Sequence, residues 1–210
     1  MRFASSAPSR LRRLWLTENC CLTRTVGLGK DKQKPFNHLL AARNARSEHI
    51  RPMAESVYIE SSVISYLAAR PSRDVVIAAR QAITETWWRN RRAEFELYIS
   101  ALVEQEIVRG DPEAAERRLK AVEKIPLVAT SPEAQSLAED LLVQGAVPAN
   151  SEEDALHIGI AVAAGIDFLL TWNFKHINNA HTKAAITAVV EAHGFVCPML
   201  CSPEELGAEI

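Results

Sequence analysis

Apolar positions along the chain alternate between short runs that predict strands and longer stretches with helical spacing. The clearest stretch is Asn150 to Ile177, in which residues 155–164 are apolar on almost every side except at His157. A helix that is apolar all round is buried between other elements. Gly165 ends this helix, and the apolar run at residues 166–172 predicts a short buried strand followed by a polar turn.

The same alternation continues through the rest of the chain from residue 53 onward. Further strands are expected at residues 57–60, 94–100, 126–130 and 195–200. Further helices are expected at residues 63–70, 73–92, 101–110, 111–124, 131–145 and 181–193. Strands that alternate with helices are typical of a parallel sheet with right-handed crossovers. We therefore expect an α/β fold of three layers, α/β/α, with a parallel sheet of about five strands.

Local signals refine two of these helices. Ser61 and Ser62 are expected to cap the helix after the first strand, because serine hydroxyls accept hydrogen bonds from unpaired backbone N–H groups. The helix at residues 73–92 is amphipathic, and its apolar residues are expected to form one stripe facing the core. The stripe consists of Val76, Ala79, Ile83 and Trp87.

Composition separates the first quarter of the chain from the remainder. Of the 210 residues, 48% are hydrophobic, which is enough for one good core. Up to Arg51 there are eleven Lys or Arg against three acids, whereas from Pro52 there are thirteen against twenty-three. We therefore expect residues 1–52 to be a basic, disordered extension or a mis-annotated start, and residues 53–210 to form one domain.

Residues 1–52 contain no apolar run typical of a secretory signal or a membrane span. Cysteines are few, and their spacing does not match a metal finger. They are Cys20, Cys21, Cys197 and Cys201. These features favour a cytoplasmic protein that does not insert into a membrane.

Three acids occupy positions that would normally be apolar. Glu60 directly follows the apolar residues of a strand, and a buried parallel strand seldom ends in an acid without a partner. In the helix after the second strand, Glu106 lies at about 40° from Leu102, inside the apolar arc, whereas Glu104 lies at about 200°. Asp154 stands at helical spacings of four and seven from apolar residues. We interpret Glu60, Glu106 and Asp154 as inward-facing acids and Glu104 as a solvated one.

A group of inward acids requires a cation. Each acid taken alone is more typical of a helix end or a surface charge. Gathered at the carboxyl edge of one sheet, however, two such charges about 5 Å apart repel each other by roughly 3 kcal/mol at an effective dielectric near 20. Hard oxygen ligands in small number, with positions left for water and phosphate, suit Mg²⁺ or Mn²⁺ rather than zinc.

Four segments of the sequence carry a resemblance to a known family. They are VYIESSVISYL, ISALVEQEI, EEDALHIGIAVAAGIDFLLTWN and the following FKHI. In order and spacing they resemble the motifs of PIN-domain nucleases, especially the VapC-like toxins of bacterial toxin–antitoxin pairs. The resemblance covers residues 57–200, and the order of the four motifs makes it more specific than any one of them.

The resemblance implies a PIN-like fold and a metal-dependent endoribonuclease that hydrolyses RNA phosphodiester bonds. It implies Mg²⁺ or Mn²⁺ held by Glu60, Glu106 and Asp154, with Asn173 at the fourth catalytic position. Ser62 matches the residue that orients the first acid. The implied partners are an RNA substrate and a cognate antitoxin that docks near residues 75–88, and family members often form homodimers.

Two positions depart from the family pattern. The first acid is usually Asp, whereas here it is Glu60, whose arm is one methylene longer. Asn173 replaces an acid, which weakens a second metal site. One alternative is therefore a catalytically weak or inactive PIN-like module that binds RNA or a protein. A second is a receiver-like phosphotransfer domain, but the phosphoacceptor Asp that this class carries after a central strand is missing.

Other polar residues near the motifs are weaker candidates. His157 and His176 are close enough in sequence to Asp154 and Asn173 to contact a substrate, although such residues more often complete a wall or face solvent. Lysine and arginine side chains beside the motifs are able to meet phosphates, but solvated charges are the simpler interpretation. They are Arg109 and Lys175.

Overall fold

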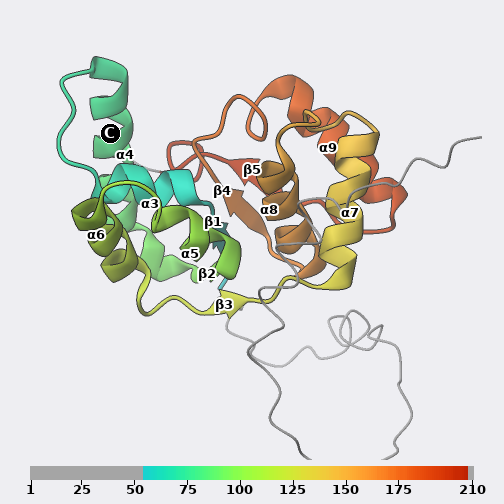
Figure 1. Ribbon diagram of the computed structural model, residues 1–210, viewed down its shortest axis with the longest axis horizontal. Coiled ribbons are helices and arrows are strands. Elements are labelled where there is room, and N and C mark those ends of the chain that lie inside the picture. Colours follow the sequence, from blue (N-terminus) through green and yellow to red (C-terminus); the bar gives the residue numbers. More distant parts are fainter. Residues whose placement is uncertain (1–53, 208–210) are drawn as a thin grey trace, which may run out of the picture.

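In the computed structural model, which describes residues 54–207, the chain is built on a parallel sheet of five strands (Figure 1). The predictions for residues 1–52 lie outside the described residues. The strands are β1 (Ser56–Ile59), β2 (Glu96–Ser100), β3 (Leu127–Val128), β4 (Phe168–Leu170) and β5 (Met199–Cys201). Their order is β3-β2-β1-β4-β5, and every neighbouring pair is parallel. The predicted α/β class and strand number are confirmed.

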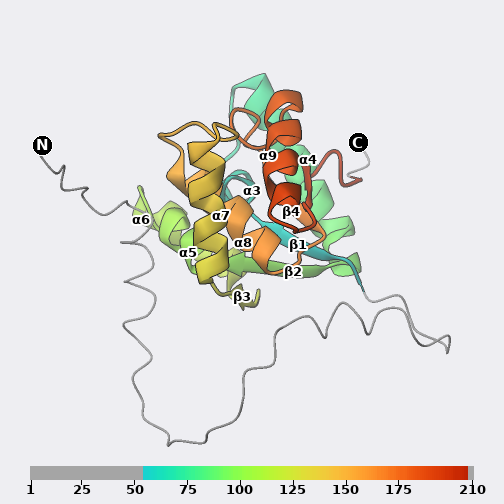
Figure 2. The ribbon, with the colours of Figure 1, turned by 90° about the vertical axis from the view of Figure 1, so that its right-hand side faces the viewer.

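Helices cover both faces of this sheet and give three layers (Figures 1 and 2). One face carries α3 (Ser61–Ala68), α4 (Val75–Asn90), α5 (Ala101–Ile107) and α6 (Pro112–Val122). The other carries α7 (Pro132–Val143), α8 (Glu152–Ala163) and α9 (Ala180–Ala192). A single 3₁₀ turn at Arg92–Glu94 precedes β2. No helix within residues 54–207 combines the length and apolar character needed to cross a membrane.

The order of the strands creates a switch point beside β1. From β1 the chain proceeds to β2 and β3 on one side, and it later returns to place β4 and β5 on the other. The backbone N–H of Glu60 donates to the carbonyl of Leu170 at 3.0 Å and extends the β1–β4 pairing. In open parallel sheets, ligands bind outside the carboxyl ends of the strands at such a switch point. The fold therefore places the residues after β1 and β4 at the position where function is expected.

The predicted all-apolar helix is α8, and it is buried as expected. Its residues 155–162, His157 included, are all buried. Gly159 lets α8 lie directly against α7, because a Cβ atom at this position would lie 2.2 Å from the carbonyl oxygen of Ala134. Substituting this glycine would force the two helices apart.

Three local expectations differ from the structure. The cap of α3 is Glu60, whose carboxylate accepts from the backbone N–H of Ser62, because its backbone is extended and its side chain turns back over the first turn. The last strand begins at Met199 rather than residue 195, since Pro198 has no N–H to donate to a sheet. The predicted stripe of α4 is only half buried: Trp87 lies in the core, but Val76 is 60% exposed because the start of α4 projects beyond its neighbours (Figure 1).

Candidate metal centre

Glu60 lies at the carboxyl end of β1 and is held by donors on both carboxylate oxygens. Its Oε1 accepts from the Ser61 hydroxyl at 2.8 Å and from the Ser62 backbone N–H at 3.0 Å. Its Oε2 accepts from the Ser62 hydroxyl and from the Thr171 hydroxyl, the latter at 2.7 Å. The side chain is only 5% exposed, so these bonds replace its hydration. Its position is therefore fixed before any ligand arrives.

Glu106 is held by a buried histidine rather than by hydroxyl groups. The Nε2 atom of His157 lies 2.9 Å from the Oε2 atom of Glu106. The other ring nitrogen, Nδ1, lies 2.8 Å from the Tyr58 hydroxyl, which in turn lies 2.7 Å from the Ser100 hydroxyl. This chain of hydrogen bonds runs from the core to the edge of the sheet and fixes the ring plane of His157.

Glu60, Glu106 and His157 form a group that can hold a metal ion. Each offers one ligand atom, and these atoms all lie within 4.8 Å of one another. The Ser61, Ser62 and Thr171 hydroxyls that bond Glu60 are able to rotate, so a carboxylate lone pair is available to a cation without movement of the backbone. Two carboxylates and one imidazole therefore form a donor set that fits a divalent ion.

Electrostatics favour the charged form of His157. Burial lowers the pKa of His157, but its hydrogen bond to Glu106 and the charges of Glu106, Glu60 and Asp154 outweigh burial, so that the pKa lies above the ordinary 6.5. A protonated ring donates from both nitrogens, to Glu106 and to the Tyr58 hydroxyl. A metal ion would have to compete with this proton before it could use the Nε2 atom of His157 as a ligand.

Asp154 lies beside the metal-binding group but does not belong to it. Its Oδ1 accepts from the side-chain amide of Asn173 at 2.9 Å, and its Oδ2 lies 2.7 Å from the Nδ1 atom of His176. Burial raises the pKa of Asp154, and this effect outweighs the hydrogen bond with His176, which lowers it. The nearby charge of Glu60 raises the pKa further. Asp154 is therefore a partly buried acid close to the group.

The turn after β4 connects these acids. Asn173 accepts from the backbone N–H of His176 at 3.0 Å, and its own N–H donates to the Thr171 hydroxyl at 2.9 Å. The backbone N–H of Trp172 donates to the Ser62 hydroxyl at 2.9 Å. Residues 171–176 therefore bond both to the Glu60 side of the site and to Asp154.

The structure thus brings Glu60 and Glu106 into one group and ties Asn173 to Asp154. Ser62 contacts Glu60 through both its backbone N–H and its hydroxyl. Sequence reasoning treated His157 as a wall residue and did not single out Thr171. The available signals were a lone polar residue in an all-apolar helix and a threonine at the end of a buried strand.

Cationic side chains beside the site differ in their partners. Arg109 forms a two-pronged ion pair with Glu153, with N···O distances of 2.8 and 3.2 Å. Lys175 is exposed in the turn after β4 and forms no ion pair within residues 54–207. Arg109 is therefore committed to a carboxylate, whereas Lys175 remains available to an anion.

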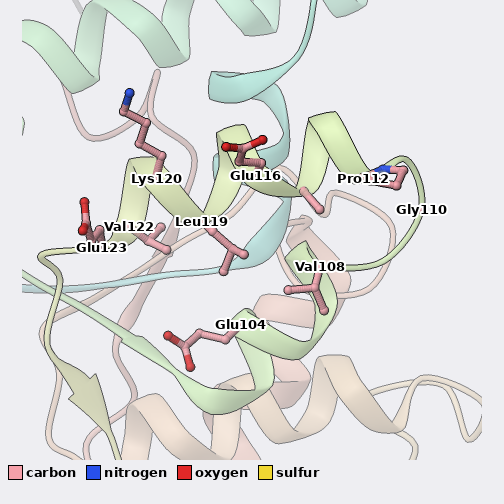
Figure 3. Close-up of a pocket in the computed structure, with 10 residues that line it drawn as sticks. Glu104, Val108, Gly110, Pro112, Glu116, Leu119, Lys120, Val122 and Glu123 are labelled. Carbon is pink, nitrogen blue, oxygen red and sulfur yellow. The ribbon is translucent and has the colours of Figure 1, made fainter.

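A groove of about 850 Å³ between α5 and α6 lies apart from this group (Figure 3). Val108, Leu119 and Val122 give it an apolar part, and Glu104 also lines it. It contains none of the acids that bond to His157 or Asn173. This groove is therefore separate from the candidate metal centre.

Neither a scan against models of known protein families nor a search of curated proteins finds a match for this chain.

Proposed function

We propose that this protein is a metal-dependent endoribonuclease of the PIN-domain type that hydrolyses RNA phosphodiester bonds. The observation that carries the proposal is the group of Glu60, Glu106 and His157, whose ligand atoms lie within 4.8 Å of one another at the switch point of the sheet. The resemblance of the four sequence motifs to VapC-like toxins supports the same conclusion. Carboxylate ligands favour Mg²⁺ or Mn²⁺, and an imidazole nearby favours Mn²⁺ of the two.

The residues of the site have separate tasks in this proposal. Glu60 and Glu106 supply the oxygen ligands, while His157 orients the Glu106 carboxylate through its Nε2 hydrogen bond. A bound divalent ion supplies Lewis-acid chemistry, which lowers the pKa of water and offsets charge on a phosphoryl oxygen. Asp154 accepts the proton of the attacking water, because burial raises its pKa toward that of a useful base. Asn173 and His176 hold its carboxylate in place.

Metal removal and replacement test the activity. The full chain, stripped of metal with a chelator, should leave a single-stranded RNA intact, and Mn²⁺ or Mg²⁺ should restore internal cleavage. Glu60→Gln should not regain cleavage, whereas Glu55→Gln, an exposed change just before β1, should behave as the wild type. RNA cleavage that persists in the chelated protein, or that survives Glu60→Gln, would overturn the proposal.

One observation favours the alternative of an inactive RNA- or protein-binding module. The Glu60 carboxylate already accepts hydrogen bonds from Ser61, Ser62 and Thr171, so binding a cation costs it at least one of them. The two functions differ in their response to metal. An intact centre should gain melting temperature in millimolar Mg²⁺ or Mn²⁺, whereas a module without a working centre should not.

We also propose, from the resemblance, that a protein antitoxin covers the start of α4. Val75, Val76 and Ile77 are 82%, 60% and 40% exposed, an apolar surface that a partner would remove from water. Co-expression with the product of a neighbouring gene should yield a complex, and charged substitutions of Val75 and Val76 should dissociate it. Size-exclusion chromatography of the protein alone tests whether it forms the homodimer that the family favours.

A further inference from the structure

Three aromatic rings surround an arginine next to the metal-binding group. The Cζ atom of Arg80, in α4, lies 5.9 Å from the ring centre of Tyr66, 5.5 Å from that of Trp172 and 5.1 Å from that of Phe174. Trp172 packs edge-on against both other rings, with centroid distances of 5.9 Å. We call these four residues the Arg80 cluster. Cations at such distances are attracted to ring faces.

The Arg80 cluster is attached to the metal-binding group through the backbone. Trp172 donates its N–H to the hydroxyl of Ser62, which bonds Glu60, and Phe174 directly follows Asn173. The indole N–H of Trp172 donates to the Thr84 hydroxyl at 2.8 Å, which fixes its ring against α4. The cluster is therefore joined by hydrogen bonds to the residue that holds Glu60.

Arg80 has no acidic partner in the described part of the chain. One of its N–H groups donates to the Tyr66 hydroxyl at 3.2 Å, and its other guanidinium nitrogens are not among the buried unsatisfied atoms. Arg109, by contrast, is paired with Glu153. An unpaired, partly exposed guanidinium is suited to a phosphate group.

Phe174 offers a ring face at the same place. It is 38% exposed, whereas Trp172 behind it is 5% exposed. The backbone carbonyl of Phe174 accepts from the side-chain amide of Asn179 at 2.9 Å, so the turn that carries the ring is held in place. A fixed, exposed ring beside an unpaired arginine combines the two features by which proteins bind single strands: a stacking surface and a cation for the backbone.

We propose that the Arg80 cluster is a nucleotide subsite for single-stranded RNA, in which Phe174 stacks on an unpaired base and Arg80 binds the adjoining phosphate. This inference rests on the proposed nuclease function for its choice of ligand. It selects single strands, because a base inside a duplex cannot present its face to the ring. It also explains how a centre rich in acids holds a polyanion, since the attraction comes from outside the acids.

Binding measured without divalent metal separates this subsite from the chemistry. The probe is a short fluorescent single-stranded RNA, titrated with the full chain in a chelator and followed by anisotropy. Phe174→Leu should weaken binding about tenfold, because stacking on an aromatic ring contributes on this scale. Phe174→Tyr keeps the ring and should bind as the wild type does.

Arg80 is tested through the dependence on salt. Arg80→Met should weaken binding and lower the slope of log affinity against log salt by about 1, the value expected for one lost phosphate contact. Arg80→Lys keeps the charge and should keep that slope. The matched control is Arg89→Met, since Arg89 lies on the same helix but is exposed and paired with Glu85. Melting temperatures of all variants identify any that fail to fold.

The outcomes distinguish the subsite from the nuclease. If the wild type binds single-stranded RNA through Phe174 and Arg80 but does not cleave it with Mn²⁺, the subsite stands and the proposed activity falls. If the wild type cleaves RNA while Phe174→Leu and Arg80→Met bind it as tightly as Arg89→Met does, the subsite is wrong. The subsite is also wrong if the wild type does not bind single-stranded RNA. It is wrong as well if Phe174→Leu and Arg80→Met lose as much affinity for duplex RNA as for single-stranded RNA. If Phe174→Leu and Arg80→Met abolish binding of a protein partner but leave RNA binding unchanged, the cluster binds protein rather than RNA.

Discussion

The two sides of the candidate metal centre hold their carboxylates by different means. On the β1 side, Glu60 is 5% exposed, and its donors within residues 54–207 are hydroxyl and backbone N–H groups. On the other side, Glu106 of α5 and Asp154 of α8 each lie against a histidine, His157 and His176 respectively. Hydroxyl and amide donors keep their protons across the working pH range, whereas imidazoles do not.

Because of this difference, Glu60 has a fixed position, whereas the orientation of Glu106 varies with the protonation of its histidine partner. The donors around Glu60 come from the start of α3 and the end of β4, so its position follows from the two central strands. The orientation of Glu106 depends on a chain through His157 and Tyr58 that begins inside the core. We therefore expect substitution of Glu60 to remove function outright, and substitutions in the hydrogen-bond chain behind Glu106 to weaken function or make it depend on pH.

Glu60→Gln should have the largest effect. It removes a charged ligand and places an amide N–H₂ group among the donor groups of Ser61, Ser62 and Thr171. We expect metal-dependent cleavage to fall by more than about 100-fold, since even the loss of outer partners of a metal ligand costs roughly 10- to 100-fold. The unmatched donors should also lower the free energy of unfolding by about 1–3 kcal/mol. Single-turnover cleavage and urea denaturation measure the two effects, and near-normal cleavage would contradict the assignment of Glu60.

Asp154→Asn should have the second largest effect, a large loss of cleavage without harm to the fold. Its carboxylate is the proposed proton acceptor, a role that contributes about 100-fold or more to the rate. Because burial raises the pKa of Asp154, and the charge of Glu60 raises it further, a neutral side chain relieves an unfavourable charge in the folded state. The melting temperature without metal should therefore be equal to that of the wild type or higher. Cleavage at the normal rate would show that Asp154 has another role.

Tyr58→Phe should have a moderate effect that reaches the centre through His157. The change removes a buried hydroxyl and leaves His157 and Ser100 without one partner each, which costs about 1–3 kcal/mol in the free energy of unfolding. Cleavage should fall less than with Glu60→Gln, because both carboxylates remain. The control is Tyr98→Phe, because the hydroxyl of Tyr98 donates to the exposed Glu96. Equal free energies of unfolding for the two variants would mean that the buried hydrogen-bond chain does not stabilise the fold.

The pH dependence of stability should be the smallest effect. The pKa of His157 is raised above 6.5 in the folded protein, so the folded state binds this proton more tightly than the unfolded chain. The resulting stabilisation is fully present below pH 6.5 and is lost as the pH rises through the raised pKa of His157. Melting temperatures of the metal-free wild type should fall over this range relative to His157→Gln. The matched control is His193→Gln, because His193 is exposed. Its melting temperature should fall with rising pH as that of the wild type does.

Much of the fold could be predicted because its signals are local. Apolar runs, Gly165 and the helical spacing around Glu106 each depend on a few neighbouring residues, and they predicted the order of elements and which acid of α5 faces inward. The contacts of the site were harder to predict. Thr171 meets Glu60 only because β4 pairs with β1, and His157 bonds Glu106 only because α8 packs across the sheet from α5. Such contacts depend on how segments far apart in the sequence align with one another, and no local sequence pattern determines that alignment.

The bond between Glu60 and Thr171 joins residues 111 positions apart in the sequence. A parallel strand can join β1 only after a long crossover, so the carboxylate that caps α3 lacks one of its donors until β4 has been made. A growing chain that has left the ribosome only as far as α8 would carry its acids unassembled. The candidate metal centre would thus remain incomplete until β4 has been made.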